Sequence, residues 1–115
     1  MGLTIWHNPR CSKSRASLAL LEERGLKPKI VHYLETPPSA KELTAVLAAL
    51  KKSPREILRK GEDIYKALGL DDPKLSDAAL IKAMTENPLL IERPIVINGG
   101  KAALGRPPEA VLEIV

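Results

Sequence analysis

The sequence contains one cysteine and no phenylalanine, and aromatic side chains make up only 3% of its 115 residues. A single cysteine excludes a disulfide within the chain and is typical of the reducing cytoplasm. With so few aromatic rings, Leu, Ile, Val and Ala must build the core. No apolar run approaches the roughly 20 residues that cross a bilayer, and the polar run His7 to Pro9 would interrupt a signal peptide. We therefore expect a cytoplasmic protein that has no membrane partner.

Charge of neither sign dominates, because 18 basic and 14 acidic residues give a net charge of +4. This excess is too small to indicate a nucleic-acid-binding protein, so we expect no nucleic-acid partner. A small anionic substrate would fit the mild positive excess. The length suits one modest core, and we expect a single domain over residues 1–115.

The cysteine, Cys11, stands where an apolar segment, Leu3 to Trp6, is followed by a helix-forming one, Ser14 to Arg24. A thiol at a strand-to-helix junction lies at the helix N-terminus. There the free N–H groups and the positive end of the helix dipole favour an anion. This position predicts a thiol that ionises readily.

Basic residues around Cys11 strengthen this prediction. Lys13 and Arg15 add positive charge, and so would His7 if it were protonated. Each favours the thiolate, which is the nucleophilic form of cysteine. The same donors would hold an oxyanion beside the sulfur.

The presence of one thiol limits the chemistry. Ser14 occupies the position of the second cysteine in a C-x-x-C motif, so the chain cannot resolve its own mixed disulfide. A two-electron reduction needs two thiols, and glutathione and glutaredoxin are the natural suppliers of the other. A phosphatase-type loop needs C-x5-R, whereas Arg15 gives C-x3-R and position 17 is a serine, which disfavours that class. We assign no metal site and no bound cofactor.

The order of the expected elements indicates an α/β fold. Strands at Leu3–Trp6 and Lys29–Tyr33 flank the first helix, and such a unit makes them parallel. Segments at Ile95–Ile97 and Ala102–Leu104 form a hairpin, and a last helix follows. A parallel pair followed by a hairpin, with helices over the sheet, is a thioredoxin-like arrangement with a four-stranded mixed sheet. The helical stretch at about 39–91 is then an insertion.

Capping patterns mark helix starts within this insertion. Ser39 and Ser53 each precede a glutamate by three residues, which is the pattern of a capping box. We expect the helix after Ser53 to be short and to include Ile57, Leu58 and Arg59. Further helices are expected at Asp63 to Leu68 and after Ser76, the latter burying Leu80, Ala83 and Met84.

Three arginines, Arg59, Arg93 and Arg106, are candidate ligands for an anion. Arg93 and Arg106 each precede a proline. In a thioredoxin-like fold the proline that opens the third strand is normally cis and lies against the cysteine, so Arg93 should point at the sulfur. The planar guanidinium fork suits a tetrahedral oxyanion.

The sequence resembles the glutaredoxin-coupled arsenate reductases, in particular their short chromosomal members, over nearly its whole length. The resemblance implies that Cys11 is the nucleophile and that His7 lowers its pKa. It also implies that Ser14 and Arg15 assist the thiolate, and that the three arginines bind arsenate. The segments that carry it are His7 to Arg15, Tyr33 to Pro38, Ile57 to Lys60, Asn87-Pro88, Glu92 to Val96 and Gly105 to Glu109.

The implied reaction is the reduction of arsenate to arsenite. The Cys11 thiolate attacks arsenic, glutathione attacks the thiol-bound arsenic, and glutaredoxin resolves the mixed disulfide. Two alternatives remain open: a glutathione-dependent thiol oxidoreductase acting on another electrophile, and a redox-related regulator that binds a protein partner. Ser14 disfavours the regulator, because the best-understood regulators of this kind use C-x-x-C.

Overall fold

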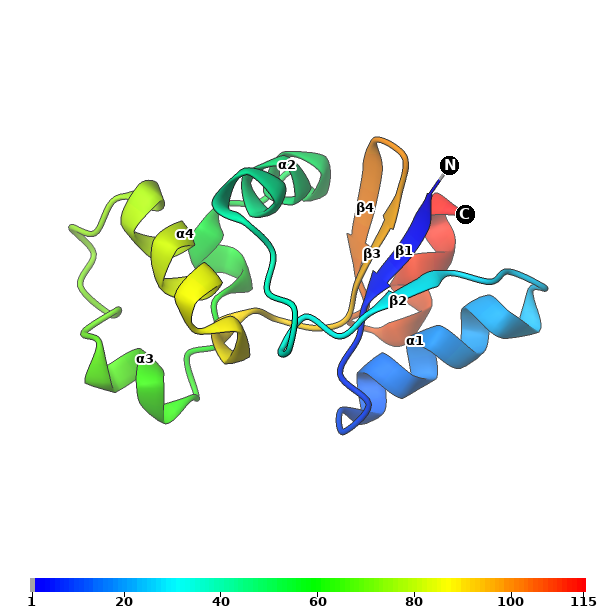
Figure 1. Cartoon of the computed structure of the whole chain (residues 1–115), viewed down its shortest axis with the longest axis horizontal. Coiled ribbons are helices and arrows are strands. Elements are labelled where there is room, and N and C mark those ends of the chain that lie inside the picture. Colours follow the sequence, from blue (N-terminus) through cyan, green and yellow to red (C-terminus); the bar gives the residue numbers. More distant parts are fainter. Residues whose placement is uncertain (1) are drawn as a thin grey trace. The chain divides into compact units, whose positions relative to one another are not determined.

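The computed structural model describes residues 2–115, and the chain divides into two compact units. One unit combines the residues up to Thr36 with Arg93–Val115, and the other is Pro37–Glu92. Figure 1 follows both along the chain by colour. None of the helices within residues 2–115 has the length and apolar character needed to cross a membrane. The assignment of the chain to a single domain stays a prediction.

The first unit contains a four-stranded mixed sheet, as predicted. Its strands are β1 (Leu3–Trp6), β2 (Lys29–Val31), β3 (Ile95–Asn98) and β4 (Lys101–Leu104), in the order β2-β1-β3-β4. β1 runs parallel to β2 and antiparallel to β3, and β4 returns antiparallel to β3. This confirms the thioredoxin-like fold class.

β2 ends two residues earlier than the sequence suggests. The His32 carbonyl accepts the N–H groups of Glu35 and Thr36, both at 2.9 Å. This turn takes the backbone away from the ladder after Val31, and Tyr33 is buried outside the strand. The residues that follow β2 therefore form a tight turn at the carboxyl edge of the parallel pair.

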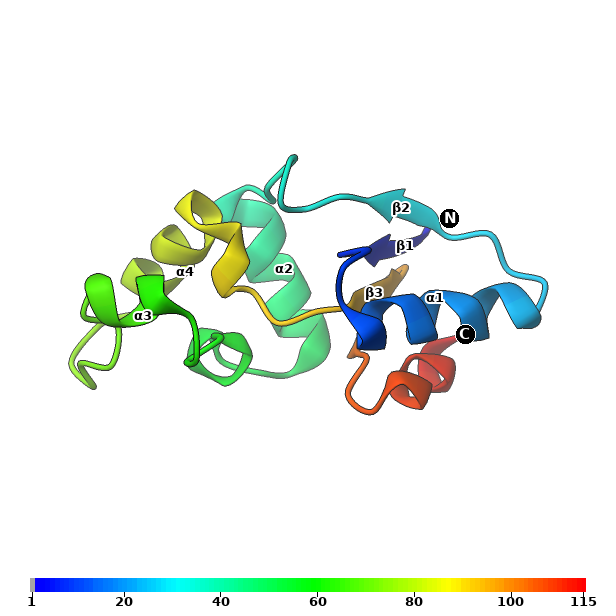
Figure 2. The ribbon, with the colours of Figure 1, turned by 90° about the horizontal axis from the view of Figure 1, so that it is seen from below.

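Two helices cover one face of this sheet. α1 (Ser12–Glu23) and the 3₁₀ helix η3 (Pro108–Ile114) lie side by side there (Figure 2). The core between the helices and the sheet consists of fully buried aliphatic side chains: Ile5, Leu21, Val96 and Val111. The expectation of an aliphatic core is confirmed.

The second unit is helical. It contains α2 (Ala40–Leu50), α3 (Asp63–Ala67), α4 (Asp77–Glu86) and two 3₁₀ turns, η1 (Pro54–Ile57) and η2 (Pro88–Leu90). The predicted capping box is present at α2, where Ser39 Oγ accepts from Glu42 N at 3.1 Å and Glu42 Oε1 accepts from Ser39 N at 3.0 Å. Ser76 caps α4 through a single bond, in which its Oγ accepts from Ala79 N at 3.1 Å, and the three residues expected to face inward are buried.

One helix is shorter than predicted. η1 ends at Ile57, so the expectation that it includes Leu58 and Arg59 is wrong. The backbone there pairs with the segment after η2 instead. Arg59 N donates to Leu90 O at 2.7 Å and Glu92 N donates to Ile57 O at 2.9 Å. These bonds satisfy the backbone groups that a longer helix would have satisfied internally.

Gly105 is required by close packing at the end of β4. Its N–H donates to Pro94 O at 2.9 Å, which draws the backbone against the start of β3. A Cβ at this position would lie 2.5 Å from Ser17 Oγ and 2.6 Å from Pro94 Cγ. Only glycine fits without displacing α1 or the loop that carries Arg93.

We expect Gly105→Ala to lower the free energy of unfolding by about 1–3 kcal/mol, which is the usual cost of overpacking a filled site. Urea denaturation followed by circular dichroism measures the change. Gly100→Ala is the matched control in the same unit, because nothing lies within 4 Å of a Cβ there. Equal stability of the two variants would contradict the close-packing argument.

Candidate active site around Cys11

The loop between β1 and α1 holds Cys11 at the helix start. α1 begins at Ser12, two residues earlier than predicted, and Cys11 is its N-cap in an extended conformation (φ −95°, ψ 122°). Cys11 N donates to Asn8 O at 3.0 Å and Arg10 N donates to Asn8 Oδ1 at 3.0 Å. The asparagine therefore fixes the turn that delivers the sulfur to the helix N-terminus.

A buried polar cluster lies behind this loop. His7 Nδ1 and Ser14 Oγ are 2.6 Å apart, and Ser14 Oγ also accepts from Asn8 N at 3.0 Å. His7, Asn8 and Ser14 are at most 6% exposed. Since buried polar groups need such partners, the cluster holds the loop to the first turn of α1.

The surroundings of His7 favour its neutral form. Burial is the main factor that lowers the pKa of His7, and the coulombic effects of His32 and Arg15 lower it further, against a smaller opposite effect of Glu22. This direction opposes the positive charge considered for His7 in the sequence. Its contact with Ser14 makes it a residue that positions the loop.

Three neighbouring groups favour the Cys11 thiolate. Burial alone would raise the pKa of the Cys11 thiol, but the backbone N–H of Ser14, the Arg93 guanidinium and the backbone N–H of Lys13 lower it. The net pKa is lower than that of an ordinary cysteine. Cys11 therefore has the environment of a reactive thiol.

Arg93 reaches the sulfur from the start of β3. The Arg93–Pro94 peptide bond is cis, as the thioredoxin-like fold predicts, and Pro94 is buried. Nε and Nη1 of Arg93 are buried and have no hydrogen-bond partner among residues 2–115. A guanidinium with two such donors suits an oxyanion, and the assignment of Arg93 and Arg106 to anion binding stays a prediction.

A backbone hydrogen bond of the preceding residue brings Arg106 close to the loop that carries Arg93. It follows Gly105, whose N–H bonds the carbonyl of Pro94, and it is half-buried. The Arg106–Pro107 bond is also cis. The fold therefore brings the residue after β4 to the same end of the sheet as Arg93.

The other two predicted arginines have partners of their own. Arg15 is exposed, and its Nη1 donates to Pro9 O at 2.7 Å, which braces the cysteine loop. Arg59 lies in the helical unit, where it pairs with Glu62 at 3.0 Å and Glu92 at 2.7 Å. The assignment of Arg15 and Arg59 to anion binding stays a prediction.

Two residues of the site were not singled out from the sequence. Asn8 fixes the cysteine turn, and its position before Pro9 is a turn signal that could have identified it. Gly105 allows β4 to approach the Arg93 loop, a role that depends on contacts distant in sequence. Within residues 2–115 no group of three or more His, Cys, Asp or Glu side chains could hold a metal.

Known proteins are similar to this chain in both sequence and fold. The ArsC family matches residues 6–114 of the chain. The chain is 58% identical over 112 residues to the uncharacterised Escherichia coli (strain K12) protein YfgD, covering 96% of this chain and 94% of that protein. It is 51% identical over 116 residues to the arsenate reductase of Haemophilus influenzae, with 100% of both covered. A solved structure of arsenate reductase from Vibrio cholerae superposes with a TM-score of 0.96 at 52% identity, covering 100% of this chain and 98% of that one.

The fold and these relatives place the chain among the oxidoreductases. The chain belongs to the ArsC family. The resemblance seen in the sequence is thereby confirmed.

We expect Arg93→Ala to raise the pKa of the Cys11 thiol, because the variant loses the one charged donor to the sulfur while burial still opposes ionisation. Thiolate absorbance as a function of pH measures this, and with one cysteine in the chain the signal has a single source. Arg24→Ala, at the exposed C-terminal end of α1, is the control. An unchanged titration of the Arg93 variant would show that the guanidinium does not act on the sulfur.

We expect acidification to destabilise the protein through His7. The folded-state pKa of His7 lies below 6.5, so the unfolded chain binds the proton first as the pH falls. The free energy of unfolding should decrease from about pH 6.5 down to the folded-state pKa and change no further from this residue below it. Urea titrations at several pH values should show a flatter dependence for His7→Asn, which keeps a polar group near Ser14 but does not titrate. Identical slopes for the two proteins would refute the assignment.

Proposed function

We propose that this protein reduces arsenate to arsenite, with Cys11 as the nucleophile, glutathione as the second thiol and glutaredoxin as the partner that regenerates Cys11. The observation that carries the proposal is the pairing of a thiol of lowered pKa with Arg93, whose Nε and Nη1 are buried and unused. The arsenate reductase of Haemophilus influenzae, 51% identical over its full length, supports arsenate as the oxyanion.

In the first step the Cys11 thiolate attacks arsenic(V). An S–As bond forms, an As–O bond breaks, and the oxygen leaves as water after accepting protons. Nε and Nη1 of Arg93 bind the arsenate oxygens, where negative charge is concentrated. Donors that are already fixed in a partly dehydrated site stabilise this charge without reorganisation during the reaction.

In the second step the sulfur of glutathione attacks the Cys11 sulfur of the arsenic-bound intermediate. An S–S bond forms between glutathione and Cys11, the As–S bond breaks, and its electron pair stays on arsenic, which becomes arsenic(III). The thiol proton passes to an arsenic oxygen, and arsenite leaves. A glutaredoxin thiolate then attacks the glutathione sulfur and releases the Cys11 thiolate. Both thiol suppliers require a reducing cytoplasm.

The remaining residues position these groups. His7 and Ser14 hold the loop against α1, and Arg15 holds it through the Pro9 carbonyl. Arg106 approaches the Arg93 loop by way of Gly105 and supplies a further positive charge at that end of the sheet. Arg59 is included as a further arsenate ligand, as the family resemblance implies.

We expect arsenate-dependent oxidation of NADPH when the protein is coupled to glutathione, glutaredoxin and glutathione reductase. Cys11→Ser should lose this activity completely, because serine is neither ionised at neutral pH nor able to form the disulfide. Arg24→Ala, an exposed change on the same helix, should retain it. Turnover that survives in the Cys11 variant would rule the mechanism out.

Arg93→Ala separates arsenate chemistry from general thiol exchange. We expect its kcat/KM for arsenate to fall about 100-fold, as for the loss of one oxyanion donor. Its exchange with glutathione disulfide should match the parent protein above the thiol pKa of both, because exchange needs only the sulfur. Intact thiol exchange without an arsenate-specific loss would favour the alternative of a thiol oxidoreductase that acts on another electrophile.

A further inference from the structure

A cavity opens beside the cysteine loop, in the same unit as Cys11. One wall is the loop residues His7, Asn8 and Arg10, and the other is His32, Leu34 and Glu35 of the turn after β2. Its volume is about 350 Å³. β1 and β2 are parallel neighbours, so the cavity lies at the carboxyl edge of the pair, where α/β sheets commonly bind their ligands.

The side chains of Arg10 and Glu35, which line this cavity, are not paired with other residues that the structure describes. The side chains of Arg10 and Glu35 are exposed and form no hydrogen bond or ion pair with the residues that the structure describes. Arg15 and Arg55, by contrast, bind carbonyl oxygens of the chain. The cavity thus has one positive and one negative side chain on opposite walls, both exposed to solvent.

The walls are well fixed. The loop wall is tied to α1 by the buried cluster of His7, Asn8 and Ser14. The opposite wall is held by the two hydrogen bonds to the His32 carbonyl. Leu34, 37% exposed, adds an apolar surface between the charges. A preformed site loses little entropy when a ligand binds.

We propose that this cavity binds glutathione for the second step, with Arg10 holding a carboxylate and Glu35 the γ-glutamyl ammonium group. The inference rests on the function proposed above, which needs a second thiol next to Cys11. Glutathione carries two carboxylates, one ammonium group and a central thiol, so its charges complement the cavity. The volume of the cavity is near the lower limit for small-molecule sites, about 300 Å³, which suits a ligand as small as glutathione. Arg10 directly precedes Cys11, so one wall of the cavity belongs to the same loop as the reacting residue.

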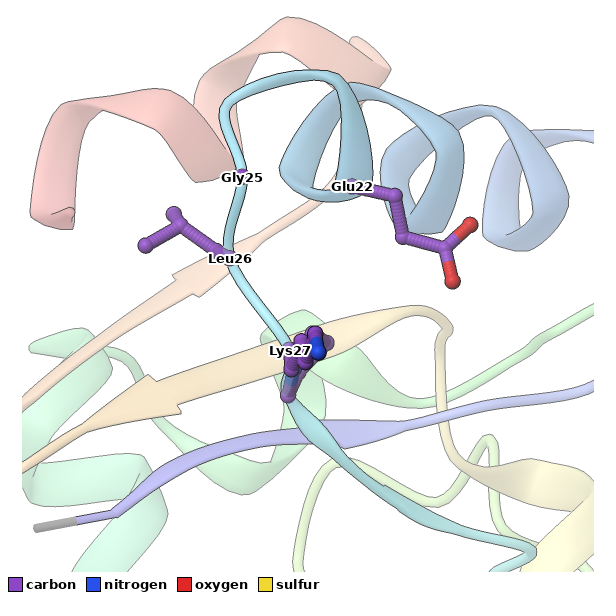
Figure 3. A pocket seen from close by; sticks show the side chains of 5 residues that line it. Glu22, Gly25, Leu26 and Lys27 are labelled. Carbon is purple, nitrogen blue, oxygen red and sulfur yellow. The ribbon is translucent and has the colours of Figure 1, made fainter.

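The pocket at the other end of α1 serves as a comparison. It is lined by Glu22, Gly25, Leu26, Lys27 and Pro28 (Figure 3). α1 has 12 residues, so this pocket is about 18 Å along the helix from Cys11. It is too distant to deliver a thiol to the sulfur, and its lysine provides a control.

The test uses S-methylglutathione, which keeps every charge of glutathione but cannot react. Titration of the full chain, followed by amide chemical shifts, should perturb residues 7–10 and 32–35. Arg10→Ala and Glu35→Gln should each raise the Kd about 10-fold, whereas Lys27→Ala should bind like the parent chain. In the coupled assay the same two variants should raise the KM for glutathione about 10-fold and leave the KM for arsenate nearly unchanged.

The outcomes separate the two proposals. Binding that maps elsewhere, or is absent, overturns the cavity assignment. If the parent chain reduces arsenate but neither variant changes the KM for glutathione, the cavity assignment fails and the proposed function stands. If the parent chain does not reduce arsenate but binds S-methylglutathione in the cavity with the expected losses in the variants, the glutathione site stands and arsenate is the wrong substrate.

Discussion

The placement of one sulfur at the first turn of α1 is the constraint on which the rest of this site depends. Burial opposes ionisation of Cys11, and two helix N–H groups together with Arg93 overcome that opposition. These donors come from two parts of the fold: the N–H groups require the turn fixed by Asn8, and Arg93 requires the start of β3. Gly105 lets the backbone after β4 lie against Pro94, the residue that follows Arg93.

The charge beside the sulfur does not depend on histidine. His7 is buried, its pKa is lowered chiefly by that burial, and its ring contacts Ser14 Oγ behind the loop. Backbone N–H groups and a guanidinium keep their donor character across the physiological pH range, whereas an imidazolium would not. The activation of Cys11 is therefore insensitive to pH above the thiol pKa. The pH sensitivity that His7 introduces acts on stability.

The sequence predicted the features that local patterns determine. The alternation of strand and helix patterns predicted the sheet, and the capping patterns at Ser39 and Ser76 predicted two helix starts. The proline at position 94 predicted that Arg93 lies beside the sulfur, whose pKa it lowers. The failures involve partners distant in sequence. Leu58 leaves the predicted helix because the backbone around it pairs with residues 90–92. The lowered pKa of His7 likewise results from burial that the sequence does not reveal, and the role of His7 toward the thiol stays a prediction. Propensity and spacing contain no information about such partners.

The contrast between Arg59 and Arg93 explains why anion binding is assigned mainly to the latter. Two carboxylates already neutralise Arg59, so an anion there would compete with Glu62 and Glu92. Nε and Nη1 of Arg93 have no such partner, and each buried unsatisfied donor costs about 1–3 kcal/mol in the free protein. An oxyanion that bonds both donors removes this cost. The two unpaired donors of Arg93 therefore support the proposal of a tetrahedral oxyanion beside Cys11 over that of an uncharged electrophile.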